Sequence, residues 1–205
     1  MAVVSNGTTI VDAGALGASA GAGKLTLIKT LTASSSSTLS FVNGASSVVF
    51  NSTYDSYIFK FINCHPASNG VKFEFNFSTD SGSNYNVTKS STQFCALNSE
   101  GGGGELGKTG GRLAQSTNFQ RLVNDADLGA DSDQSISGTL QIFNPSSTTF
   151  VKHFISTTQY SHSGDYSVNV FTAGYGNTTS SIDAIRFQMS SGNIDAGTIK
   201  MYGVG

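Results

Sequence analysis

The stretch Val71-Lys-Phe-Glu-Phe-Asn-Phe77 decides the fold class of this chain. Its apolar residues recur at every second position, so Val71 and the three phenylalanines share one face of an extended strand. Lys72, Glu74 and Asn76 fall on the opposite face. This pattern is typical of a β-strand that packs one face on a core and turns the other toward water.

Period-two alternation of this kind returns along most of the chain. Turn-forming pairs such as Asn43-Gly44 and Asn144-Pro145 separate the runs. Many short strands without alternating helices predict an all-β fold, an antiparallel β-sandwich with a jelly-roll-like arrangement. The longer predicted strands lie at 25–31, 56–63, 71–77, 136–143, 182–189 and 197–202, and the shorter ones at 38–42, 47–50, 92–97, 150–156 and 166–173.

The composition excludes several classes of protein. Charged residues make up only 12% of the chain, against roughly 25% in an ordinary soluble protein. A net charge of -2 lacks the basic footprint that binds nucleic acid. No apolar run approaches the roughly 20 residues that span a bilayer, and Met1–Gly7 has no signal-peptide pattern. We therefore expect a protein made in the cytoplasm, without nucleic acid or a membrane as partner.

Two stretches depart from the strand pattern. Residues 13–23 are rich in Gly and Ala, so we divide the chain into an N-terminal arm at 1–24 and a single sandwich domain at 25–205. We interpret 98–135 as a long loop, either an assembly surface or a mobile insertion. Within it, Ser116–Leu128 has the only helical spacing of apolar residues.

Gly102-Gly-Gly-Glu-Leu-Gly-Lys-Thr109 matches the pattern of a phosphate-binding loop. That loop requires a helix that begins at the Lys-Thr pair, so that its first amides face the phosphates. Gly110 and Gly111 follow directly and disfavour a helix start. We therefore interpret the match as accidental and expect no binding of nucleotide.

Carboxylates and histidines form no strong site in the sequence. Asp125, Asp127, Asp131 and Asp133 can offer oxygens to Ca²⁺, but their spacing misses the calcium-loop pattern, and a solvated acidic face explains them better. No serine lies in a nucleophile-elbow motif. We therefore predict no enzyme activity, no catalytic residue, no bound metal and no cofactor. The three histidines, His65, His153 and His162, are scattered and lack metal-ligand spacing. Of the three glutamates, Glu74, Glu100 and Glu105, two lie beside or within the glycine run, which is unsuited to hold a preorganised general acid.

Cysteines and tyrosines leave one alternative function open. Cys64 and Cys95 are expected to be reduced, buried and unpaired, as is usual in a cytoplasmic protein. Exposed loop tyrosines can stack on sugar rings, although the chain has no Trp and no clustered carboxylates to bind sugar hydroxyls. A glycan-binding protein is therefore the alternative hypothesis. Its candidate tyrosines are Tyr54, Tyr85, Tyr160, Tyr166 and Tyr175.

Several stretches resemble small structural proteins of tailed bacteriophages that infect marine bacteria, including cyanobacteria. The most specific is Ala184-Ile-Arg-Phe-Gln-Met-Ser-Ser-Gly-Asn-Ile-Asp-Ala-Gly-Thr-Ile-Lys-Met-Tyr-Gly203. The runs at 27–39, 59–67 and 143–147 are similar as well. The resemblance implies a component of the virion surface, either a head decoration or a tail or fibre protein.

The expected function is therefore that of a non-enzymatic structural protein of the virion. Edge strands with little charge to protect them predict a homo-oligomer. The resemblance implies that this oligomer is a trimer and that its other partners are virion proteins. The alternative is an adhesin of the phage tail that binds a host surface glycan. A polar surface with few ions is suited to packing in symmetric arrays, because little charge must be desolvated.

Overall fold

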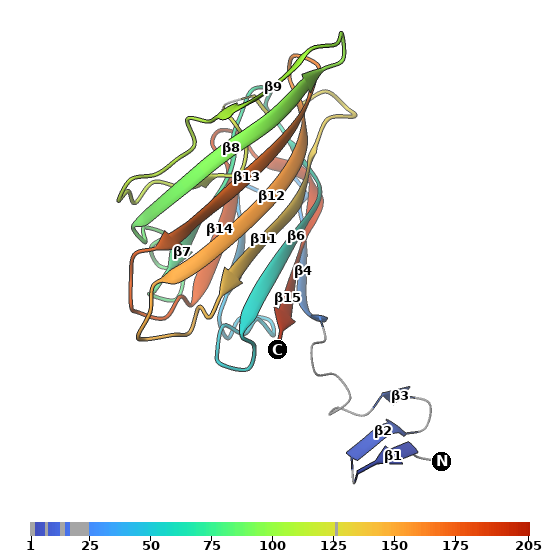
Figure 1. The fold of residues 1–205 in the computed structure, drawn as a ribbon, viewed down its shortest axis with the longest axis vertical. Coiled ribbons are helices and arrows are strands. Elements are labelled where there is room, and N and C mark those ends of the chain that lie inside the picture. The colour runs from blue at the N-terminus through green and yellow to red at the C-terminus, as the bar shows by residue number, and fades with distance from the viewer. Residues whose placement is uncertain (1–2, 7, 13–14, 17–24, 126) are drawn as a thin grey trace.

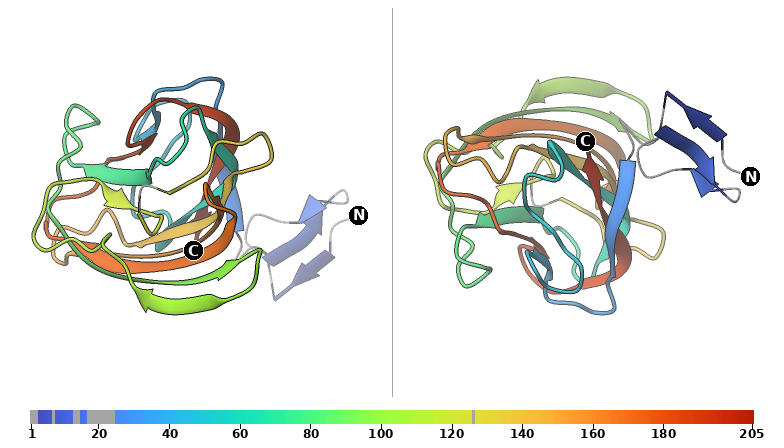
Figure 2. Two further views of the ribbon diagram at one scale, coloured as in Figure 1. Left: turned by 90° about the horizontal axis from the view of Figure 1, so that it is seen from above. Right: turned by 90° about the horizontal axis from the view of Figure 1, so that it is seen from below.

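The computed structural model describes residues 3–6, 8–12, 15–16, 25–125 and 127–205. Two antiparallel sheets pack face to face, one of eight strands and one of four (Figure 1). The predicted all-β antiparallel sandwich is confirmed, with sheets of unequal size. Seen from its two ends, the larger sheet curves around the smaller one (Figure 2).

The eight-stranded sheet has the order β4-β15-β6-β11-β12-β13-β8-β9, and the four-stranded sheet has the order β10-β7-β14-β5. Most connections cross between the two sheets, so most strand neighbours are distant in sequence. The strands of the larger sheet are β4 (Leu25–Thr32), β6 (Ser56–Pro66), β8 (Lys89–Ser99), β9 (Gly104–Lys108), β11 (Ile136–Phe143), β12 (Lys152–His162), β13 (Tyr166–Gly176) and β15 (Ile194–Val204). Those of the smaller sheet are β5 (Leu39–Val42), β7 (Phe73–Ser78), β10 (Gln120–Arg121) and β14 (Ala184–Met189).

A third, small sheet lies in the predicted N-terminal arm. It consists of β1 (Val3–Ser5), β2 (Thr8–Asp12) and β3 (Ala15–Leu16), paired in that order. Apart from Ala15 and Leu16, the Gly/Ala stretch at 13–23 lies outside the described residues.

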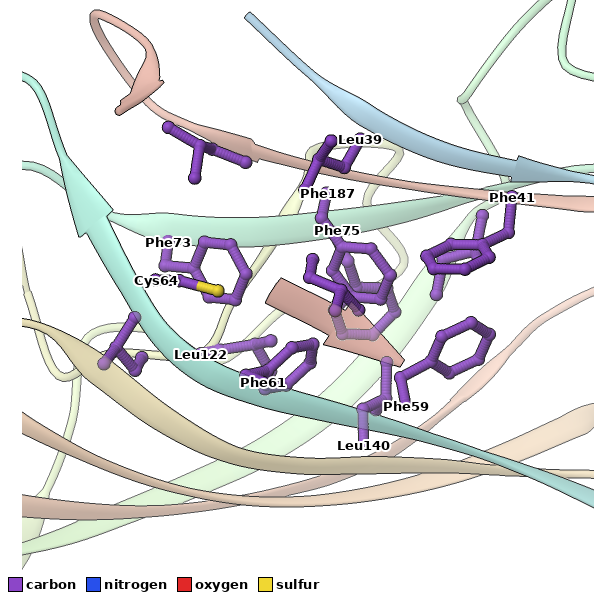
Figure 3. Close-up of a cluster of buried hydrophobic side chains, with 14 of the residues drawn as sticks. Leu39, Phe41, Phe59, Phe61, Cys64, Phe73, Phe75, Leu122, Leu140 and Phe187 are labelled. Carbon is purple, nitrogen blue, oxygen red and sulfur yellow. The ribbon is translucent and has the colours of Figure 1, made fainter. Parts of the chain in front are cut away.

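The core between the two large sheets is aromatic. Phe187 of β14 lies at its centre, with ring centroids 5.4 Å from Phe59 and 5.2 Å from Phe61. Phe73 meets Phe61 edge to face at 5.2 Å. Figure 3 shows these rings between the sheets. Such pairs contribute about 0.5–1.5 kcal/mol each beyond the area they bury.

The side chains on the second face of β7 are more buried than the alternation predicts. Asn76 was expected to face water but is fully buried, because segments 85–89 and 116–119 cover it. Its Nδ2 donates to the carbonyls of Tyr85 at 2.7 Å and Thr117 at 2.9 Å. The ammonium group of Lys89, also buried, donates to Asn76 Oδ1. Hydrogen bonding therefore compensates the burial of these polar groups.

The predicted helix at Ser116–Leu128 is wrong. Gln120 and Arg121 instead form β10 and pair with Phe75 and Glu74 of β7. The described part of the chain contains no helix, and so none that could cross a bilayer. Leu122, Val123 and Leu128 are buried. Their helical spacing is coincidental, because the described residues of this segment form bends, isolated bridges and the short strand β10 that pack on the core.

Two further predictions need correction. Residues 47–50 form no strand, although Val48 and Phe50 are buried from an irregular segment. The stretch 98–135, predicted as a long loop, contains β9 and β10. The glycine-rich β9 was missed because it carries too few side chains to show a period. Cys64 and Cys95 are buried and form no disulfide, as predicted.

Candidate binding site

The β8–β9 turn and the β12–β13 turn lie at the same end of the sandwich (Figure 1, top). Residues of these turns, together with Asn124, Asp131 and Asp133, line two hollows. Their volumes are about 450 Å³ and 420 Å³. His162 and Tyr166 line both hollows. Concave sites of about 300–1,000 Å³ are typical of small-ligand binding.

His162 is held in a fixed position at the end of β12. Its Nδ1 accepts a 2.7 Å hydrogen bond from the backbone N–H of Gly164. Its Nε2 lies 3.5 Å from Asp127 Oδ2, and its ring meets the Tyr166 ring edge to face at 5.1 Å. Tyr166 itself packs against the hydrophobic core. The two rings are therefore held together by their contacts and border both hollows.

Asp127 contacts His162 and is itself held by Tyr160. Tyr160 donates a 2.7 Å hydrogen bond to Asp127 Oδ1, and both side chains are buried. Burial raises the pKa of Asp127, although the hydrogen bond from Tyr160 and the nearby His162 oppose the shift. Burial and the carboxylate raise the pKa of Tyr160. The pair is thus part of the framework of the site.

Gln134 fixes the rim of the larger hollow. Its buried side chain accepts a 3.0 Å hydrogen bond from Asp131 N–H and donates one of 3.2 Å to the carbonyl of His162. A Cβ on Gly129 would lie 1.8 Å from Gln134 Oε1, so glycine leaves room for this amide. The segment that carries Asp131 and Asp133 is therefore tied to β12.

Four exposed carboxylates line the larger hollow: Glu100, Asp131, Asp133 and Asp165. The expectation of no clustered carboxylates is therefore wrong. They come from three separate segments, so their proximity depends on the tertiary fold. Serines 135, 137, 161 and 167, with Gln159, supply neutral hydroxyl and amide groups to the same lining.

The four aspartates Asp125, Asp127, Asp131 and Asp133, which are close in sequence, have different surroundings in the structure. Asp125 forms a 2.9 Å ion pair with Arg121, and Asp127 is buried beneath His162. Only Asp131 and Asp133 reach the hollow. Within the described residues, no group of three or more His, Cys, Asp or Glu side chains is arranged to hold a metal ion.

The five candidate tyrosines have different surroundings, and none is fully exposed. Tyr160 is 2% exposed and belongs to the core, because β12 turns its even-numbered residues inward. The Arg186 guanidinium lies 3.9 Å from the ring centroid of Tyr85, and Tyr54 packs on Tyr57. Tyr175 lies at the opposite end of β13 from Tyr166. Tyr166 is the one of the five that lines both hollows, and Tyr160 contributes to the lining of the larger one.

The phosphate-loop match lies in an antiparallel hairpin. Residues 104–108 form β9 and pair with β8, and residues 110–119 contain turns, bends and a single β-bridge. The hydroxyl of Thr109 is buried and donates to Gln93 Oε1. This geometry does not present a helix N-terminus to a phosphate.

The other two histidines lie away from His162. His65 contacts the carbonyl of Gln134, and His153 lies on the outer face of β12.

The outer face of the eight-stranded sheet, which faces away from the smaller sheet, is the second notable surface. Figure 1 looks onto it, and no described element of the sandwich covers it. Six of the eight large hydrophobic side chains that are exposed in the described residues lie on this face: Leu25, Leu27, Ile62, Phe94, Leu106 and Ile155.

No protein-family model, curated protein sequence or solved structure matches this chain. The chemistry of both surfaces is therefore inferred from their own residues.

Proposed function

We propose that the chain is a non-enzymatic structural protein on the surface of a tailed-bacteriophage virion, where it associates with copies of itself, as a trimer, and with other virion proteins. The observation that carries this proposal is the set of six exposed apolar side chains on the uncovered outer face of the eight-stranded sheet. Extended exposed apolar surfaces on soluble proteins usually mark protein–protein contacts. The resemblance of the sequence to phage structural proteins supports the choice of particle.

Apolar side chains lie on several neighbouring strands of this face, interrupted by polar ones such as Gln141 and Thr157. Cross-strand neighbours form one row of Ala173, Ile155, Gln141, Ile58, Tyr202 and Leu27. In the adjacent row the rings of Phe94 and Phe171 stack at 5.1 Å. Burying a fully exposed side chain of this size contributes about 1.5–3 kcal/mol. Ile155 and Phe94 are 42% and 46% exposed, so each contributes a smaller amount, which must also offset the entropy lost on association. A contact across several strands therefore supports a stable association.

The two edge strands of the sheet also favour association with another chain. β4 and β9 are the edge strands, and they expose Leu27 and Leu106. Soluble monomers usually protect such edges with charges, proline or a covering segment. Edges with exposed leucines favour pairing or packing with another chain.

Location on the particle is tested by immunogold electron microscopy and mass spectrometry of purified phage that encodes this chain. We expect the protein in many copies at one regular position on the head or the tail. Its absence from purified particles, together with its presence in the lysate of infected cells, would contradict the proposal.

A further inference from the structure

We propose that the two hollows beside His162 and Tyr166 form one binding site for a neutral oligosaccharide. Each hollow exceeds 400 Å³, and both open on the same pair of rings. A chain of sugar units can therefore occupy both hollows and contact the His162 and Tyr166 rings that border them. The larger hollow includes outer-face residues of the eight-stranded sheet, such as Gln159 and Ser167, but none of the six exposed apolar residues of that face lines either hollow. The inference does not depend on the proposed virion role.

Tyr166 provides the apolar contact. Its ring packs on the core on one side and against His162, yet still lines both hollows. The C–H groups on one face of a pyranose ring pack against such an aromatic ring, and the tyrosine hydroxyl stays in contact with water. The ring is already ordered, so little conformational entropy is lost on binding.

The polar lining selects for hydrogen-bond donors. The carboxylates of Glu100, Asp131, Asp133 and Asp165 offer acceptor oxygens, and each can accept from two neighbouring hydroxyls. A ligand rich in hydroxyl groups satisfies them. A phosphorylated, sulfated or sialylated ligand would be repelled by four like charges.

Neutral groups in the lining favour a sugar over a cationic peptide. Gln159 donates to Ser167 Oγ at 2.9 Å, and Ser135 and Ser137 add hydroxyls along the same wall. Such groups both donate and accept, as sugar hydroxyls do. A lysine-rich peptide would use the carboxylates but would leave these groups and the Tyr166 ring without matched partners.

The frame of the site is organised before binding. Gln134 ties Asp131 to the His162 backbone, and Asp127 with Tyr160 lies beneath the histidine ring. Sites whose supporting groups are locked by packing and hydrogen bonds hold their ligands at lower ordering cost.

The test starts with a glycan array that includes neutral hexose and N-acetylhexosamine oligosaccharides, sialylated and sulfated glycans, and a lysine-rich peptide. We expect binding to neutral glycans only, and the strongest one is then titrated by calorimetry. Tyr166→Ala should weaken its binding at least about tenfold, whereas Tyr166→Phe keeps the ring and most of the affinity. Tyr175→Ala, on the same strand but remote from the site, is the matched control.

A second variant guards against misfolding of Tyr166→Ala. Asp131→Asn with Asp133→Asn changes only exposed side chains and should also weaken binding at least about tenfold, with an unchanged circular dichroism spectrum. The proposal is overturned if no neutral glycan binds, if the peptide or an anionic glycan binds best, or if these variants bind like the wild type.

Discussion

Tyr160 and Asp127 form a buried hydrogen-bonded pair, with the tyrosine hydroxyl 2.7 Å from Asp127 Oδ1. The same hydroxyl accepts a 3.2 Å hydrogen bond from the backbone N–H of Asn124. One side chain thus connects β12 to the segment that runs from β10 to the hollows. Removing it affects both the core and the candidate binding site.

We predict that Tyr160→Phe lowers the free energy of unfolding by about 1–3 kcal/mol, because Asp127 and Asn124 each lose a buried partner. Urea unfolding monitored by circular dichroism measures this change. Tyr175→Phe is the control, since its hydroxyl has only a 3.4 Å contact with Gln115 near the surface. A loss at Tyr160 no larger than that of the control would contradict the role given to this pair.

The buried Lys89 predicts a pH dependence of stability. Burial lowers its pKa from 10.5 to about 7. Between these values the unfolded chain binds a proton that the folded protein does not, so the free energy of unfolding rises with pH through this window. Below about pH 7 both states hold the proton, and the full penalty of a buried charge remains.

Comparison with Lys89→Met isolates this effect. From pH 7 to 10, the wild type should gain at least about 1 kcal/mol of stability relative to the variant, measured by urea unfolding at each pH. Identical pH profiles for the two proteins would show that Lys89 does not titrate in this range.

Phe187 is the residue on which the aromatic core depends most, since its ring contacts five other phenylalanine rings. We expect Phe187→Ala to lower the free energy of unfolding by about 3–5 kcal/mol, through lost burial and the cavity that remains. Phe150→Ala removes a ring that is 70% exposed and should change stability by less than about 0.5 kcal/mol. Equal effects of the two substitutions would contradict the described core.

Deletion of residues 2–23 should leave the sandwich folded. Among the described residues, β1 to β3 pair only with one another, and the hydrophobic core begins at Ala33. We expect a nearly unchanged β-rich circular dichroism spectrum and melting temperature, together with loss of attachment to particles. Wild-type occupancy of the truncated protein on particles would show that the arm is not needed for attachment.

The sequence predicted those elements whose side chains alternate strongly. β7 and β11 are examples, because each buries one face against the aromatic core. It failed at Ser116–Leu128, where pairing with β7 overrides a helical spacing, and at Asn76, which is covered by segments distant in sequence. Such tertiary pairing leaves no local signal.

The candidate site was predicted only in part. Tyr166, Asp131 and Asp133 were named as candidates, but nothing in the sequence shows that Glu100 and Asp165 lie beside them. These residues meet because β8 and β13 are antiparallel neighbours, so that Ser99 pairs with Tyr166. The outer apolar face was hidden for a similar reason, since alternation does not tell which face of a strand stays uncovered.

Sedimentation velocity at tens of micromolar protein tests the central claim, that the outer face of the eight-stranded sheet is an assembly surface. We predict a trimer for the wild type and a folded monomer for the double variant Phe94→Asp with Ile155→Asp, because charges on this face oppose its burial. Phe150→Asp, which places the same charge at an exposed site in the β11–β12 connection, should remain a trimer. A monomeric wild type, or a double variant that assembles like the wild type, would contradict the account.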